Sequence, residues 1–378
     1  MRSLVGVCSV FSLYGKFFKR SALLLVLLVG VLGCGYALKD SYGQLRKEYD
    51  RLVTDGALKQ ISGTPIDPME YIDQNIIALN FQKSLNNGEA KFLYFNDSVM
   101  GGHNDHEPRT TIAEMVADRL QVKITPVNRA GYTAVLYREY AAMASLAKDK
   151  PLLAIISINL RTFCDQCFFE SKWEYAGNNY YLHLLSHPPR LIDVIRSAVS
   201  GRGGDERYWD QYLDEMKTDR YKELFIKFKS QQEDFFEGIG SGLDEEDRAR
   251  GRHFVENYIF DIDLQHPMLQ SLLQTATQFK SSGTKVVFYI TPIDVQGGKS
   301  LVGPDFEPII KKNVKVIKEA LAEIGVDCLD MSSDLPTDRF VDREYACEHL
   351  DFAGRAHVAS RLGDWLRATD KTFQQASR

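Results

Sequence analysis

The chain has 378 residues, a net charge of -5 at pH 7 and a hydrophobic share of 44%. This composition is typical of a folded globular protein and excludes a disordered or collagen-like chain. The slight acidity also excludes a general nucleic-acid-binding protein, because phosphate binding needs a dense surface of Lys and Arg.

The first 38 residues form a hydrophobic leader. Residues 21–38 carry no charge and follow Lys16, Lys19 and Arg20. At about 1.5 Å per residue, this run spans a bilayer core of about 30 Å, and the basic flank should stay in the cytoplasm. The leader is either an uncleaved signal anchor or a lipoprotein signal, since residues 31–34 resemble a lipobox with Cys34 as the lipidated residue. Both outcomes tether the chain to the cytoplasmic membrane and send the remainder to the periplasm or the cell surface.

Four of the six cysteines lie outside the leader, an even number in a compartment that is then oxidising: Cys164, Cys167, Cys328 and Cys347. Four cysteines allow three pairings, and the sequence cannot choose among them. We expect Cys164 to pair with Cys167 and Cys328 with Cys347. One Cys-x-x-Cys without further ligands is weak evidence for a zinc site, so disulfides are the preferred interpretation.

Helical and strand-like patterns alternate through most of the chain. Residues 39–90 are predicted to be a stalk with helices over 41–58 and 68–85. The expected strands are residues 91–95, 122–127, 152–159, 284–291 and 326–331, and the expected helices are 109–120, 134–147, 268–280, 308–324 and 353–368. This alternation predicts an α/β fold, with a central parallel sheet covered by helices on both faces. Ligands of such sheets bind at the carboxyl ends of the strands.

The alternation breaks between about residues 168 and 267. Helix-like pieces cover 208–216 and 221–236, and glycines interrupt the pattern at 201–204 and 238–242. We expect a largely helical insertion in a domain that spans 91–370. It could serve as a lid, a substrate platform or a partner surface.

A candidate nucleophile follows the first strand. Residues 95–102 (FNDSVMGG) supply a strand end, a tight turn and an approach to a helix, which is the setting that a nucleophilic serine needs. The Asn96-Asp97-Ser98 turn resembles the Gly-Asp-Ser block of the SGNH (GDSL-type) serine hydrolases. Asn tolerates unusual turn dihedrals nearly as well as Gly, so this departure is mild.

Further blocks of the SGNH family occur in the same order. Gly131, after the second strand, resembles the glycine whose backbone N–H helps to form the oxyanion hole. Asn159, after the third strand, occupies the place of the Asn that donates to the oxyanion, although two other letters of that block are missing. Residues 348–355 (EHLDFAGR) resemble the C-terminal block and make His349 the general base for Ser98. The resemblance covers residues 90–165 and 284–368 and implies a flavodoxin-like three-layer sandwich.

The acid that should orient His349 is not evident. The family has an Asp three residues before its His, and this chain has Ala346 there. Asp342 and Glu348 are possible substitutes, and a backbone carbonyl could also hold the ring. The site could therefore also be inactive.

Two other motifs could carry chemistry. His103, Asp105 and His106 could bind a metal, but solvation or substrate contact fits a loop without further ligands better. Residues 297–300 (GGKS) hint at a phosphate-binding loop, but Ile293 stands where that motif requires its first glycine. We therefore expect neither a metal nor a cofactor.

The resemblance implies an extracytoplasmic serine esterase or O-acyltransferase, because membrane-anchored relatives commonly act on O-acyl groups of cell-envelope polysaccharides. An acylated polysaccharide or another ester would be the substrate, and a membrane acyltransferase is a possible partner. The alternatives are an inactive SGNH-like protein for binding or assembly, and a lipase or phospholipase.

Overall fold

The structure is a computed structural model that describes residues 74–101, 108–129, 131–164, 182, 219–239, 242–341, 348–369 and 373. All of these residues belong to one compact unit. The leader with Cys34 and the expected helix over 41–58 lie outside them. Within the described ranges, no helix is both long and apolar enough to cross a bilayer.

Five parallel strands form the central sheet. They are β1 (Phe92–Asn96), β2 (Ile124–Asn128), β3 (Leu153–Ile158), β4 (Lys285–Ile290) and β5 (Asp327–Asp330), in the order β2-β1-β3-β4-β5. This is the strand order of flavodoxin-like folds, so the predicted α/β fold class is confirmed. Every residue of β3, the central strand, is buried, as expected where helices cover both faces.

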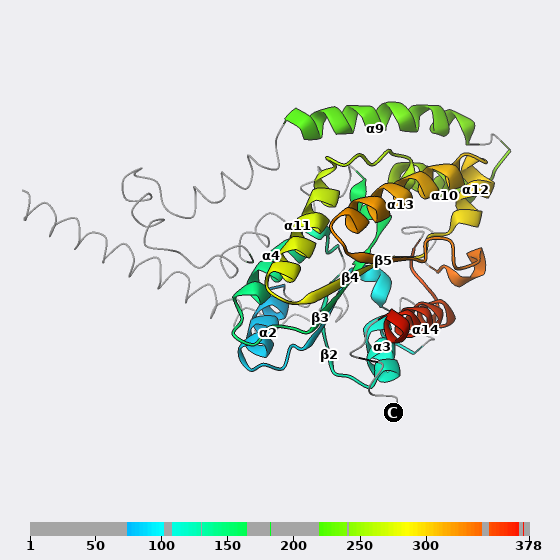
Figure 1. The fold of residues 1–378 in the computed structure, drawn as a ribbon. Helices are drawn as coiled ribbons and strands as arrows, with labels where there is room; N and C mark the ends of the chain where they lie inside the picture. Colours follow the sequence, from blue (N-terminus) through cyan, green and yellow to red (C-terminus); the bar gives the residue numbers. More distant parts are fainter. Residues whose placement is uncertain are drawn as a thin grey trace, which may run out of the picture. The chain divides into compact units, whose positions relative to one another are not determined.

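Helices cover both faces of the sheet (Figure 1). One layer contains α3 (Ile112–Leu120) and α14 (Phe352–Thr369), which pack against each other. The opposite layer contains α2 (Gln74–Asn86), α4 (Ala134–Leu146), α11 (Pro267–Ser281) and α13 (Phe306–Glu323). The sheet therefore has helices above and below it.

Local sequence explains these helices. In α13, Ile310, Val314, Ile317 and Leu321 recur at helical spacing, and all four are buried. In α3, the side chain of Thr111 accepts from the backbone N–H of Glu114, and the Glu114 carboxylate accepts from that of Thr111. This capping box satisfies two amide donors at the start of the helix.

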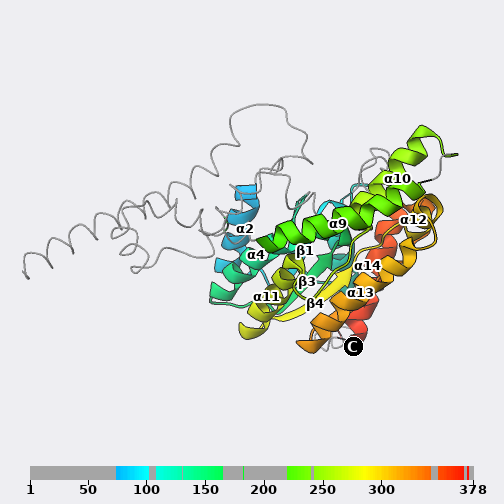
Figure 2. The same ribbon diagram turned by 90° about the horizontal axis from the view of Figure 1, so that it is seen from above.

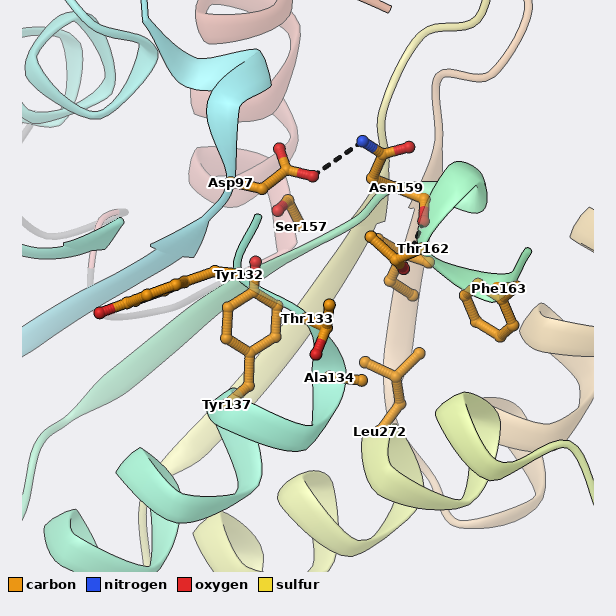
Figure 3. A pocket seen from close by; sticks show the side chains of 11 residues that line it. Asp97, Tyr132, Thr133, Ala134, Tyr137, Ser157, Asn159, Thr162, Phe163 and Leu272 are labelled. Carbon is orange, nitrogen blue, oxygen red and sulfur yellow. Dashed lines mark hydrogen bonds between the residues drawn. The ribbon is translucent and has the colours of Figure 1, made fainter. Parts of the chain in front are cut away.

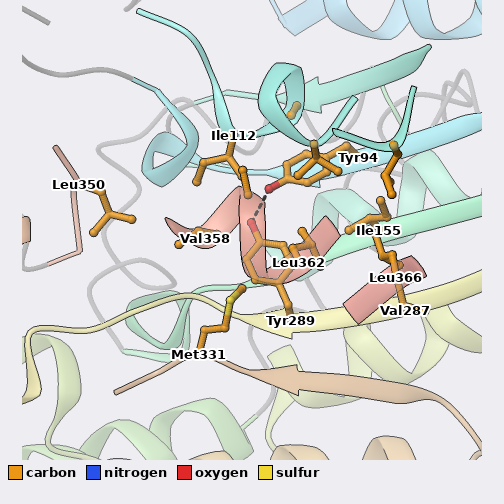
Figure 4. Packing of buried hydrophobic residues seen from close by; sticks show 14 of the residues in the cluster. Tyr94, Ile112, Ile155, Val287, Tyr289, Met331, Leu350, Val358, Leu362 and Leu366 are labelled. Carbon is orange, nitrogen blue, oxygen red and sulfur yellow. Dashed lines mark hydrogen bonds between the residues drawn. The ribbon is translucent and has the colours of Figure 1, made fainter. Parts of the chain in front are cut away.

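The core between the sheet and the α3–α14 layer contains a buried pair of tyrosines (Figure 4). The hydroxyls of Tyr94 in β1 and Tyr289 in β4 lie 2.6 Å apart. The side-chain amide of Asn96 donates to Tyr289 Oη at 2.9 Å. Asn96 is the last residue of β1, so its backbone is extended and needs no glycine-like freedom. Asn occurs at this position because its side chain binds Tyr289, and not because it tolerates unusual backbone dihedrals.

The expected helical insertion contains two described helices, α9 (Asp219–Gly238) and α10 (Glu245–Tyr258). They pack against each other, and α9 is a long helix that leads toward α10 (Figure 2). The helix α10 also packs against the short helix η2 (Leu160–Phe163) that follows β3. The last part of the insertion is therefore built onto the edge of the sheet where the candidate residues lie.

The GGKS segment forms part of an unpredicted helix, α12 (Val295–Val302). Its glycines serve close packing, because a Cβ at Gly297 would lie 2.2 Å from Asp294 Oδ2 and one at Gly298 would lie 2.3 Å from the Phe306 ring. Asp294 caps this helix and forms a buried ion pair with Arg250 at 2.7 Å. These close contacts explain why positions 297 and 298 are glycine, since any Cβ there would clash.

The expected pairing of Cys328 with Cys347 is wrong, because Cys328 in β5 is a free thiol. Burial raises its pKa to about 12. Its neighbour Leu329 packs into the α3–α14 core, and side chains alternate along a strand, so Cys328 faces the α13 layer. Cys328 is half-buried, whereas Cys164 is fully buried, with Sγ 3.9 Å from Asn257 Oδ1. Cys167 and Cys347 lie outside the described residues, so the Cys164–Cys167 pairing stays a prediction.

Candidate active site

The candidate residues follow three neighbouring strands at the carboxyl edge of the sheet. Ser98 comes two residues after β1, and Asn159 comes directly after β3. Gly131 follows β2, whose last residue, Asn128, is in register with the last residue of β1. Parallel pairing therefore gathers these loops at one edge, as the strand pattern predicts.

The turn that holds Ser98 is fixed by its neighbours. Ser98 begins a short 3-10 helix, and Asp97 caps it by accepting from the backbone N–H of Val99 at 3.0 Å. The backbone N–H of Asp97 in turn donates to Asn96 Oδ1 at 2.7 Å. Since Asn96 also binds Tyr289, the turn is anchored in the core of the sheet.

The structure brings Ser98 and His349 together across 251 positions of sequence. The His349 Nε2 atom lies 3.0 Å from Ser98 Oγ, within hydrogen-bond distance. The His349 side chain is buried, and its backbone carbonyl accepts from the N–H of Val341 at 2.8 Å. A short antiparallel bridge between Phe340 and Leu350 holds the same loop. An imidazole in this position can take a proton from the serine hydroxyl.

No protein-family model matches this chain, and no curated protein matches its sequence. The fold shown is an α/β fold with a five-stranded parallel sheet. What the site does must therefore be inferred from its geometry.

Asn159 lies beside the turn that holds Ser98, and its side-chain amide faces two carboxylates. Its Nδ2 donates to Asp97 Oδ2 at 2.7 Å and lies 3.4 Å from Glu348 Oε1 (Figure 3 shows the bond to Asp97). Burial raises the pKa of Asp97, and the bonds from Asn159 and Val99 oppose this shift. The short bond uses one amide hydrogen, while the long contact holds the second one only weakly.

Of the two acid candidates, only Glu348 is described. Its carboxylate is fully buried and binds Arg161 Nε at 2.9 Å and Tyr258 Oη at 3.0 Å, in addition to the contact with Asn159. The His349 ring is not among the described partners of this carboxylate. The Glu348 carboxylate therefore does not contact the ring that the sequence analysis expected it to orient. Asp342 lies outside the described residues.

Gly131 has a φ of 80°, in the left-handed region that favours glycine. The next residue, Tyr132, donates its backbone N–H to the carbonyl of Arg129, which closes the turn. The position therefore requires glycine for the turn itself. Its role as an oxyanion donor stays a prediction.

A small cavity lies beside Asp97 and Asn159 (Figure 3). Tyr132, Tyr137 and Phe163 supply its aromatic lining. Its volume is about 10 Å³, which is room for roughly one water molecule. The cavity is thus too small to hold a substrate by itself.

No group of three or more His, Cys, Asp or Glu residues able to hold a metal occurs in the described ranges. His103, Asp105 and His106 lie outside them. The expectation that the site has no metal is therefore neither supported nor contradicted at that loop.

Sequence reasoning missed His266, which supports η2 behind Asn159. Its Nδ1 accepts from the backbone N–H of Met268, so its Nε2 carries the proton and donates to the Phe163 carbonyl at 3.2 Å. The ring is buried and stacks on Phe228. The only signal in the sequence was a polar residue before Pro267, which is typical of a helix start.

We expect His266 to make folding pH-dependent. Burial lowers its pKa from 6.5 to about 4, so the unfolded chain binds the proton more readily than the folded one. This contribution to stability is complete above pH 6.5 and is lost as the pH falls toward 4, by roughly 3 kcal/mol in total. Urea unfolding at pH 7, 5.5 and 4 measures it. His266→Asn keeps a side-chain oxygen that can accept from the Met268 N–H, but it does not titrate, so its free energy of unfolding should change less between pH 7 and 4. An equal change in both proteins would refute the role of His266.

Proposed function

We propose that the chain is a serine-dependent esterase or O-acyltransferase of the SGNH type. The observation that carries the proposal is the 3.0 Å contact between His349 Nε2 and Ser98 Oγ at the carboxyl edge of a parallel sheet. The order of the sequence blocks around Ser98, Gly131, Asn159 and His349 adds to it. A hydroxyl, an imidazole and an oxyanion site are the parts that acyl transfer through a covalent intermediate needs.

In the proposed mechanism, His349 Nε2 takes the Ser98 proton as Oγ attacks the ester carbonyl. The carbonyl oxygen gains negative charge, and the backbone N–H groups of Ser98 and Gly131 stabilise it. Asn159 can contribute its second amide hydrogen, because only the first is held tightly by Asp97. Protonated His349 then returns the proton to the leaving alcohol, and an acyl group remains on Ser98.

The acyl group leaves in a second step of the same kind. Water or a sugar hydroxyl gives its proton to His349 and attacks the acyl carbon, which regenerates Ser98. Water as acceptor makes the protein an esterase, and a hydroxyl makes it a transferase. The uncharged leader over 21–38 supports a membrane-tethered protein that acts outside the cytoplasm on acylated cell-envelope polysaccharide, with a membrane acyltransferase as a possible partner.

Labelling with a fluorophosphonate tests this proposal, because the probe reacts with activated serines. The full-length protein should be labelled on Ser98, as located by mass spectrometry, and should hydrolyse p-nitrophenyl acetate. Ser98→Ala should do neither, and Ser300→Ala, at an exposed serine of α12, serves as the control. Equal turnover by wild type and Ser98→Ala would reject the hydrolase.

The second candidate is a catalytically inactive protein that uses the fold for binding or assembly. It is favoured by Ala346, which stands where the SGNH family has its acid. A folded protein that resists the fluorophosphonate, with its Ser98 unmodified, would support this candidate instead.

A further inference from the structure

Glu348 is a buried carboxylate that connects three parts of the chain. It is 0% exposed, although an isolated charge is costly to bury. Its Oε1 binds Arg161 Nε at 2.9 Å, and its Oε2 accepts from Tyr258 Oη at 3.0 Å. A buried carboxylate paired with an arginine and bound by a tyrosine hydroxyl keeps one orientation, because losing Arg161 would leave its charge unpaired.

The partners come from elements that are themselves well fixed. Arg161 belongs to η2, and its own backbone N–H donates to Asn159 Oδ1 at 3.0 Å. Tyr258 is the last residue of α10 and packs edge-on against the Phe306 ring of α13. Glu348 therefore joins the loop after β3 to the end of the helical insertion.

His349 is the next residue along the chain. Its backbone is tied on one side by Val341 and by the Phe340–Leu350 bridge. The Glu348 side chain supplies the tie on the other side. A planar peptide bond links the two residues, so the anchor at Glu348 limits where the imidazole of His349 can lie relative to Ser98.

We infer that Glu348 is a positioning residue that, through Arg161 and Tyr258, holds His349 within reach of Ser98. This role rests on the proposed function. It also means that the helical insertion helps to position His349, because Tyr258 of α10 is one of the two anchors of Glu348. It also replaces the acid role that the sequence offered for Glu348. A misplacement of about 1 Å at a reacting group can cost 10²-fold in rate.

The test measures p-nitrophenyl acetate turnover per active site, with sites titrated by the fluorophosphonate. Glu348→Ala should lower kcat per titrated site about 100-fold and leave KM within about threefold. Glu348→Gln keeps the shape and an acceptor oxygen and should recover to within about tenfold of wild type. Tyr258→Phe, which removes one anchor, should lower kcat about three- to tenfold. Glu307→Ala, at a partly exposed surface ion pair, is the control and should match wild type.

A purely structural role would reduce the number of titratable sites and leave kcat per site unchanged, and that result overturns the inference. Equal losses in Glu348→Ala and Glu348→Gln also overturn it, because the charge and not the position would then matter. If Glu348→Ala does not fold, Glu348→Gln and Tyr258→Phe provide the test. An unchanged kcat in Tyr258→Phe would show that α10 does not help to position His349.

Failure of the proposed function is recognised separately, by an unlabelled and inactive wild type. In that case crystal structures of wild type and the Glu348 and Tyr258 variants decide the positioning. The inference expects the distance from His349 Nε2 to Ser98 Oγ to grow beyond 3.5 Å when the anchors are removed together. An unchanged distance contradicts it.

Discussion

Replacing His349 with alanine is expected to lower ester turnover by about 10⁴-fold. The Ser98 hydroxyl is a weak nucleophile at neutral pH, and the imidazole 3.0 Å away is the group placed to take its proton. The rate of fluorophosphonate labelling should fall together with turnover, because both need the activated serine. Stopped assays with p-nitrophenyl acetate and timed labelling measure the two quantities.

His357→Ala is the matched control for this experiment. His357 lies on α14 with its side chain 46% exposed, and its ring is 4.0 Å from Asp334. It has no part in the proposed chemistry, so turnover should stay within twofold of wild type. Turnover in His349→Ala within threefold of wild type would contradict the role of the imidazole.

Replacing Arg355 with methionine is expected to lower the free energy of unfolding by about 3 kcal/mol. Arg355 is fully buried and donates to two backbone carbonyls, that of Leu350 at 2.7 Å and that of Pro108 at 2.8 Å. Methionine fills a similar length but donates nothing, so both carbonyls lose a charged donor. The segment before α3 and the loop of His349 lose a common anchor. Urea unfolding monitored by circular dichroism measures the change.

Arg361→Met on the same helix separates this effect from a general loss of charge. Arg361 is 49% exposed and pairs with Asp334 at 2.7 Å. An exposed ion pair contributes little, so this variant should lose less than about 1 kcal/mol. Equal losses in the two variants would show that the burial of Arg355 is not what matters.

The periodic elements could be predicted because their pattern is local. The apolar spacing that predicts a helix over 308–324 corresponds to α13 (Phe306–Glu323), and the apolar run over 152–159 corresponds to β3 (Leu153–Ile158). The helix α12 was missed, since Gly297 and Gly298 lower helix propensity and suggest a loop. Only their packing against Asp294 and Phe306 explains that pair.

The partners of single side chains could not be predicted in this way. The sequence offered Glu348 as an acid for its neighbour His349, whereas its carboxylate binds Arg161 and Tyr258, which are far away in the chain. The same holds for Cys328, which faces the α13 layer as a free thiol instead of pairing with Cys347. In both cases the direction of one side chain decides, and that direction depends on long-range packing.

The sequence by itself determined the order of strands and helices, the class of fold and the residue types at the strand ends. Those properties follow from hydrophobic periodicity and turn chemistry, which act over a few residues. The order of the sequence blocks already pointed to Ser98 and His349 as partners. Only the tertiary structure decided that Asn96 anchors the turn of Ser98 and that Glu348 joins α10 to the loop of His349. Contacts between residues tens to hundreds of positions apart depend on how the layers pack around the sheet, and no local pattern encodes that geometry.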